Sequence, residues 1–205
     1  MKKPKIREII EAIKSVIFGP YTSKFPKIKV EPPDGYRGRP KYDKDLCVGC
    51  GACAEVCPAR AIDIEDKLTE KGRGVRKLTQ HYDICIFCGQ CEKACITEKG
   101  ITLSKEYELS SDDRATMIDE VEKDLLFCER CGSVIGAIDH IRFLAKKLGP
   151  LAFSNPTIFL ARHDELELLE KTAPRGETPH KRSDYIRVLC PNCRREVIFT
   201  EEWGQ

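Results

Sequence analysis

The chain has no apolar run that approaches the roughly 20 residues of a membrane-spanning helix. Its formal net charge is only +2 over 205 residues. A charge this small gives no reason to expect nucleic-acid binding. The first residues lack a signal-peptide core, since Arg7, Glu8 and Glu11 interrupt the apolar pattern. These absences predict a folded cytoplasmic protein without a transmembrane segment.

No cysteine of this chain stands alone. All 12 fall in two long runs or in two short C-x2-C pairs, and a reducing cytoplasm favours metal ligation over disulfides for such groups. Asn and Gln are scarce as well, with two and three copies beside many Lys, Arg and Glu. That bias is typical of hyperthermophiles. Their cytosolic proteins do form disulfides, so a disulfide stays an alternative for the short pairs.

The two long runs form an internal repeat that organises the chain. Residues 47–57 and 85–95 share the pattern C-x2-C-x2-C-x3-C, and each cysteine returns 38 residues later. Three cysteines on one tight loop surround a cubane, while the fourth points away and binds the other cluster. A disulfide scaffold or zinc would not require two identical runs. Two 4Fe–4S clusters are therefore predicted, with the ligand sets Cys47, Cys50, Cys53 and Cys95, and Cys57, Cys85, Cys88 and Cys91.

The repeat resembles the bacterial two-cluster ferredoxins, and the resemblance implies a pseudo-twofold βαβ fold. The second half departs from the first after its fourth cysteine. Ile96 stands where the first half has Pro58, and one extra residue separates Cys95 from Ile101. We expect this departure to alter the local turn and not the ligand set.

An amphipathic helix is predicted ahead of the repeat, ending at Gly19 and Pro20. Its apolar stripe consists of Ile6, Ile9, Ile10, Ile13 and Ile17. Residues 1–46 carry twelve Lys or Arg and six Asp or Glu, a net charge of +6. Such a helix packs on its own domain, docks on a membrane subunit or lies at the lipid interface. We favour docking on a partner.

A proline-rich arm follows the helix and ends in Tyr36-Arg37-Gly38-Arg39-Pro40. Together with the helix and the tandem runs, this string resembles the signature of the ferredoxin-like subunit of complex I and of membrane-bound NiFe hydrogenases. The resemblance covers residues from about 6 to 109. Free ferredoxins have neither the helix nor the arm.

The segments between and after the runs differ in pattern. Residues 61–64 alternate as a strand, a basic turn follows, and Leu78 and Tyr82 indicate a return strand. Residues 105–124 carry eight Asp or Glu against three Lys or Arg, which predicts a solvated linker or helix face.

The last hundred residues contain the two short pairs, which are Cys128 with Cys131 and Cys190 with Cys193. Around them we expect helices over residues 134–148 and 164–171, and a hairpin with strands 186–188 and 197–199. This tail resembles that of the ferredoxin-like electron-transfer subunit of formate hydrogenlyase.

Four thiolates without an open position favour a closed, structural zinc site in this tail. Between the two pairs lie 58 residues, whereas ~15–20 residues lie between them in a usual zinc ribbon. A single iron in a rubredoxin-like site uses the same ligands, and oxidation to disulfides is a further alternative.

These elements predict an α+β fold: a bacterial two-cluster ferredoxin-like domain with an N-terminal amphipathic helix and a C-terminal four-cysteine zinc-ribbon-like module. Three regions are expected. Residues 1–44 form the helix and a docking arm, residues 45–105 the two-cluster domain, and residues 106–205 a linker with the metal-binding module.

The resemblance implies an iron–sulfur electron-relay subunit of a membrane-bound, ferredoxin- or formate-linked respiratory complex, without a catalytic centre of its own. Implied partners are small and large subunits of the hydrogenase or complex I kind, a membrane-arm subunit that contacts the N-terminal helix, and a ferredoxin or formate dehydrogenase module as electron donor or acceptor. The expected location is peripheral, on the cytoplasmic side of the cell membrane. The alternatives are a stand-alone soluble electron carrier of the polyferredoxin type and a redox-sensing assembly protein.

Overall fold

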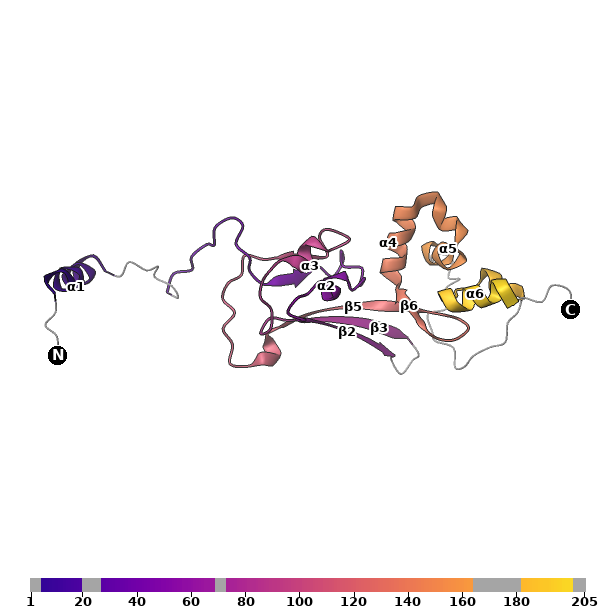
Figure 1. Ribbon diagram of the computed structural model, residues 1–205, viewed down its shortest axis with the longest axis horizontal. Coiled ribbons are helices and arrows are strands. Elements are labelled where there is room, and N and C mark those ends of the chain that lie inside the picture. The colour runs from indigo at the N-terminus through magenta and orange to yellow at the C-terminus, as the bar shows by residue number, and fades with distance from the viewer. Residues whose placement is uncertain (1–4, 20–26, 69–72, 164–181, 201–205) are drawn as a thin grey trace. The chain divides into compact units, whose positions relative to one another are not determined.

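The computed structural model describes residues 5–19, 27–68, 73–163 and 182–200 (Figure 1). Two compact units divide the chain between Tyr36 and Arg37. The first contains helix α1, and the second contains all other described elements. Over these residues, no helix combines the length and the apolar composition that crossing a bilayer requires.

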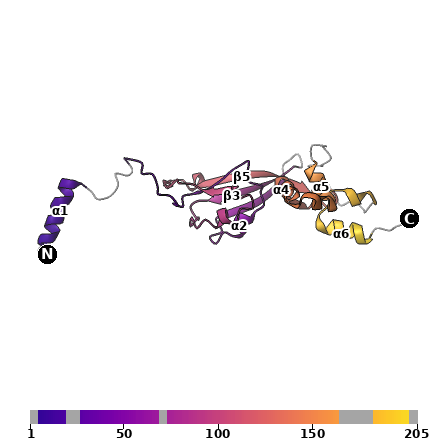
Figure 2. The same cartoon turned by 90° about the horizontal axis from the view of Figure 1, so that it is seen from above.

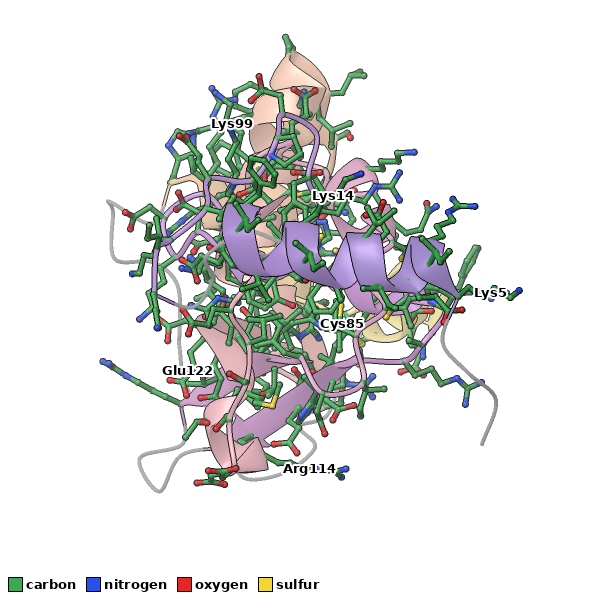
Figure 3. All side chains as sticks on the ribbon, turned by 90° about the vertical axis from the view of Figure 1, so that its left-hand side faces the viewer. Lys5, Lys14, Cys85, Lys99, Arg114 and Glu122 are labelled. Atoms are coloured by element: carbon green, nitrogen blue, oxygen red, sulfur yellow. The ribbon has the colours of Figure 1, made fainter. Side chains whose placement is uncertain are left out.

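Helix α1 (Ile6–Phe18) confirms the predicted N-terminal helix. Its first turn is capped, because the Glu8 carboxylate accepts a hydrogen bond from the Lys5 N–H at 3.0 Å. None of its residues is buried, and the stripe stays exposed, with Ile6 at 78% and Ile17 at 69%. Lys5 and Lys14 are labelled on this helix in Figure 3. The amphipathic pattern is therefore present without an apolar partner in the described part of the first unit.

An antiparallel sheet with the strand order β2-β3-β5-β6 is the centre of the second unit (Figures 1 and 2). Its strands are β2 (Ile62–Leu68), β3 (Gly74–His81), β5 (Ile118–Phe127) and β6 (Val134–Ala137). Strands β2 and β3 confirm the predicted strand and its return between the cysteine runs. Their register runs from Ile62 opposite Gln80 to Leu68 opposite Gly74.

Strand β5 corrects the expectation of a solvated linker or helix face over residues 118–124, whereas residues 105–113 lie in no helix or strand. Its residues pair with β3, with Val121 opposite Leu78. Val121 and Leu125 are buried on one face, while the acidic side chains of Glu122 and Asp124 are exposed on the other. Counting charge over both faces hid this period-two pattern. Ahead of the strand, a short 3₁₀ segment spans Arg114–Thr116.

A second, two-stranded sheet pairs β1 (Pro40–Tyr42) with β4 (Ile101–Leu103) in antiparallel register. Two one-turn helices, α2 (Ala52–Glu55) and α3 (Gln90–Lys93), contain the third cysteine of each run. They lie over one face of the large sheet (Figures 1 and 2). Between them and the sheet, one apolar core contains Cys53, Ile62, Leu78, Ile101 and Val121.

The helices that follow β6 in the tail pack against the end of the sheet at β6 (Figure 1). It contains α4 (Ile138–Leu148), α5 (Pro156–Arg162), α6 (Pro191–Thr200) and the 3₁₀ segments Gly149–Ser154 and Arg182–Ile186. The helix predicted over residues 134–148 is present only from Ile138, because residues 134–137 join the sheet instead. The helix predicted over residues 164–171 lies outside the described residues.

The hairpin predicted around Cys190 and Cys193 is wrong, since residues 191–200 form α6. Pro191 occupies the first helical position, where its missing N–H removes no hydrogen bond. Cys193 and Val197, four residues apart, are 5% and 1% exposed and share one core. Both a helix and a strand would place residues four apart on one face. A strand, however, would leave Cys190 on the opposite side.

We expect Leu78→Ala to lower the free energy of unfolding by about 2–5 kcal/mol, because it leaves a cavity in the core between sheet and cysteine loops. Leu78 is fully buried, while Leu68 on the neighbouring strand is 64% exposed. The control Leu68→Ala should change the free energy by no more than about 0.5 kcal/mol. Urea unfolding followed by circular dichroism measures both, and equal losses would contradict this description of the core.

Candidate functional site

The structure gathers the eight cysteines of the long runs into two groups of four. The first hollow, beside Tyr42 and Leu78, is lined by Cys47, Cys50, Cys53 and Cys95. The second hollow, beside Ile62 and Gln80, is lined by Cys57, Cys85, Cys88 and Cys91. Each hollow thus takes its fourth cysteine from the other run. These groups have the same members as the two predicted ligand sets, whose binding of iron stays a prediction.

The two hollows are built by equivalent local geometry. A left-handed glycine starts each short helix, Gly51 with a φ of 81° and Gly89 with a φ of 77°. Only glycine adopts this conformation readily. The turn directs the third cysteine, Cys53 or Cys91, back toward the first two of its run.

An all-sulfur donor set suits a 4Fe–4S cluster, which is held by four cysteine thiolates. Backbone N–H groups donate to sulfurs in both hollows, among them Gly49 to Cys47 in the first and, in the second, Ala61 to Cys57 at 3.3 Å and Phe87 to Cys85 at 3.4 Å. The rest of each lining is predominantly apolar, which limits contact with water. The residues therefore fit the clusters that the sequence predicts.

Burial is the main influence on the acidity of the thiols in the two hollows. It raises the pKa of Cys53 to about 11 and the pKa of Cys91 to about 12. Thiols with such pKa values hold their protons at neutral pH, so cluster assembly must release them. Burial likewise raises the pKa of Tyr42, whose hydroxyl lies 3.7 Å from Cys53 Sγ.

The departure of the second half after Cys95 forms a turn built around Thr97. The Thr97 hydroxyl lies 3.3 Å from Cys95 Sγ and accepts a hydrogen bond from the Gly100 N–H at 3.1 Å. A Cβ at Gly100 would come within 2.7 Å of that hydroxyl and 3.2 Å of the sulfur. The altered turn therefore keeps Cys95 in the first hollow and adds a polar neighbour to it. Sequence reasoning expected the altered turn but did not identify Thr97.

The four tail cysteines form a separate group. Their sulfurs all lie within 4.8 Å of one another, and all four are free thiols. Cys131 and Cys190 are 3.8 Å apart at sulfur. A tetrahedron with Zn–S bonds of about 2.3 Å has S–S edges of about 3.8 Å. The group therefore has the size of a tetrahedral four-thiolate metal site.

Hydrogen bonds and a nearby cation act on the four tail cysteines. Burial opposes ionisation of Cys131, but hydrogen bonds from the Ser133 hydroxyl and backbone outweigh it and lower its pKa to about 6. The Arg130 guanidinium lies 3.5 Å from Cys193 Sγ and forms an ion pair with Glu196. Sequence reasoning missed Arg130, although its place inside the Cys128–Cys131 pair is a usable signal. A cation beside thiolates stabilises their charged form.

Comparisons with known proteins agree with this geometry. Residues 46–99 match the family of 4Fe-4S dicluster domains. The chain is 37% identical over 57 residues to formate hydrogenlyase subunit 6 of Escherichia coli (strain K12), covering 27% of this chain and 32% of the relative. It is 31% identical over 97 residues to NAD(P)H-quinone oxidoreductase subunit I of Gloeobacter violaceus, covering 46% of each. The chain thus spans about a third and about half of these relatives.

A solved structure, the membrane-bound sulfane sulfur reductase, an archaeal respiratory membrane complex, contains a chain 29% identical to this one. The match covers 57% of this chain and 61% of that chain, with a TM-score of 0.39. The family match confirms the predicted iron–sulfur domain. The relatives confirm the predicted resemblance to hydrogenlyase and quinone oxidoreductase subunits.

Proposed function

We propose that this chain, whose residues 46–99 are a 4Fe-4S dicluster domain, relays electrons through two clusters as a subunit of a membrane-bound respiratory complex. The observation that carries the proposal is the pair of four-cysteine hollows, each completed by the other run. The clusters supply one-electron chemistry when bound, and this chain supplies sulfur ligands, hydrogen bonds and burial. The relatives named for formate hydrogenlyase and quinone oxidoreductase support a complex of the hydrogenase or complex I kind.

The two centres lie close enough in the fold to form one relay. Helices α2 and α3, which carry Cys53 and Cys91, pack against each other. The charge on Cys53 also contributes to raising the pKa of Cys91, so the two hollows are electrostatic neighbours. In the proposed relay, an electron enters at one centre, passes to the other and leaves for a neighbouring subunit.

Helix α1 is the proposed membrane-side contact. Its exposed apolar stripe and the basic character of residues 1–46 suit a membrane-arm subunit at the cytoplasmic face. The proposed partners at the other contacts are small and large subunits of the hydrogenase kind, with a ferredoxin or formate dehydrogenase module as electron donor or acceptor.

The tail is proposed to hold one zinc ion at Cys128, Cys131, Cys190 and Cys193, with a redox-active iron as the alternative. The three regions predicted from the sequence are kept as parts of this function: residues 1–44 for docking, 45–105 for the clusters and 106–205 for the tail. Strand β5 joins the last two in one sheet.

The crossed ligand sets predict which centre each cysteine serves. Cys95→Ser should perturb the centre of the first hollow, although Cys95 belongs to the second run. The control Cys57→Ser should perturb the other centre. Electron paramagnetic resonance of the reduced variants distinguishes the two signals, and a shared loss in Cys95→Ser and Cys85→Ser would disprove the crossed assignment.

Removal of residues 1–18 tests the docking proposal. The apolar area of the stripe contributes about 25 cal/mol per Å² when a partner buries it. We expect the truncated chain to keep both clusters but to leave the membrane fraction. The control Glu11→Gln with Lys14→Gln changes only the polar face and should stay membrane-bound. Retention of the truncated chain would refute docking through α1, and a full-length chain found only in the soluble fraction would favour the soluble carrier.

Elemental analysis identifies the metals. About eight irons and one zinc per chain are expected from two 4Fe–4S clusters and one four-thiolate zinc site. Cys128→Ser should lose the zinc and unfold the tail while all cluster iron stays. About nine irons without zinc would replace the zinc proposal with a third redox centre.

A further inference from the structure

The two cysteine loops differ at equivalent positions. In the first cysteine loop, residues 47–50, the third position is Gly49, and in the second, residues 85–88, it is Phe87. Both have a positive φ, 68° and 52°. A side chain is therefore tolerated by the loop itself, at some strain, and another constraint must exclude it from the first loop.

That constraint is the sheet extension contributed by the tail. A Cβ at Gly49 would come within 3.1 Å of Ala137 Cβ and of Lys123 Cβ. Strands β5 and β6 thus lie directly against the first cysteine loop. At the second loop, Ile86 is 61% exposed, so that loop faces solvent in the described structure.

Two cations from the sheet lie at the first loop: one binds the loop itself, and the other binds Lys44, three residues ahead of it. The Arg76 guanidinium donates to the Gly49 carbonyl at 3.3 Å, and the Lys123 ammonium donates to the Lys44 carbonyl at 2.8 Å. Positive charge from Lys123 also acts against the effect of burial on the pKa of Cys47. The corresponding cation at the second loop is the exposed Arg37, which reaches the Cys88 carbonyl at 3.4 Å.

Each sheet cation has a carboxylate partner that lies closer to solvent. Arg76 pairs with Asp66 at 2.8 Å, and their side chains are 16% and 28% exposed. Lys123 pairs with Asp139 at 3.0 Å, and their side chains are 11% and 39% exposed. In each pair the cation makes the contact with the main chain at or beside the loop, so the positive end of the pair lies toward the loop.

Hydroxyl groups show the same asymmetry. Tyr42 lies 3.7 Å from Cys53 Sγ and Thr97 lies 3.3 Å from Cys95 Sγ, both in the first hollow. Backbone N–H groups act on sulfurs of both hollows, so the hydroxyls are what distinguishes the first. Hydrogen bonds to sulfur and nearby positive charge stabilise the extra electron of a reduced cluster.

We infer that Lys123 and Arg76, together with the Tyr42 hydroxyl, are positioning residues that raise the reduction potential of the cluster in the first hollow relative to the second. This inference rests on the proposed function. The tail therefore acts on the relay through β5, by covering and polarising one of the two centres. The electron comes from the donor of the proposed relay, the positive charges of Lys123 and Arg76 offset the negative charge that it adds, and no covalent bond forms or breaks.

The experiment measures both cluster potentials by redox titration followed with electron paramagnetic resonance. Cys95→Ser and Cys57→Ser assign the two signals. Lys123→Met keeps the length of the side chain and removes its charge, and Tyr42→Phe removes only the hydroxyl. We expect each to lower the equilibrium constant for reducing the first cluster by about threefold to tenfold, where tenfold is 59 mV for one electron. The second cluster should keep its potential.

Two controls separate this effect from a structural one. Lys77→Met removes an ammonium paired with Glu120 at 2.7 Å on the opposite face of the sheet, and should move neither potential. Lys123→Arg should restore most of the first potential. Equal shifts of both clusters, or no shift beyond that of Lys77→Met, would overturn the inference. If the Lys123→Met variant does not assemble the cluster of the first hollow, the potential of that cluster in Tyr42→Phe tests the inference in its place. A wild-type chain without clusters would instead refute the proposed function.

Discussion

Each hollow needs one sulfur from the other half of the chain, and this crossed sharing is the constraint on which the fold depends. Cys95 reaches the first hollow only if β4 pairs with β1, and Cys57 reaches the second only if α2 packs against α3. The two halves must therefore fold together. Because each set of four sulfurs draws on both halves, binding of a cluster at either hollow stabilises the pairing of the two halves.

Two further parts of the chain build the large sheet onto the two halves: the insertion between the cysteine runs, and the tail that follows the second run. The hairpin of β2 and β3 leaves the edge of β3 unpaired, and β5 fills it before β6 completes the sheet. An unpaired edge strand is open to association with other chains, so this pairing also protects the domain. The extension lies against the first cysteine loop at Gly49, where the second loop has Phe87, and the two loops differ at this position.

Local signals in the sequence were sufficient for helix α1 and for strands β2 and β3, because each depends on short spacings. The two cysteine groups followed from the repeat together with the rule that the fourth cysteine of a run serves the other cluster. The sequence misled where distant pairing decides. Strand β5 needs β3, which lies about forty residues earlier, and charge alone concealed its alternating pattern. Residues 197–199 favour a strand by propensity, yet Cys193 and Val197 bury together in a helix. Neighbours such as Lys123 and Tyr42 could not be assigned, since only the fold brings them to the sulfurs.

Strand β5 connects the group of four tail cysteines to the first hollow. Lys123 lies against the first cysteine loop, and Cys128, five residues later, follows the end of the same strand, about 16 Å away at the rise of a strand. The pairing of β5 with β3 and β6 fixes Lys123, while Cys128 ties the end of the strand to α6 through Cys190 and Cys193. A closed metal site at that end anchors the strand without taking part in electron transfer if the metal is zinc, which has no redox chemistry. In the proposed relay the tail therefore need not carry electrons, because the proposed zinc site would hold in place the strand that carries Lys123.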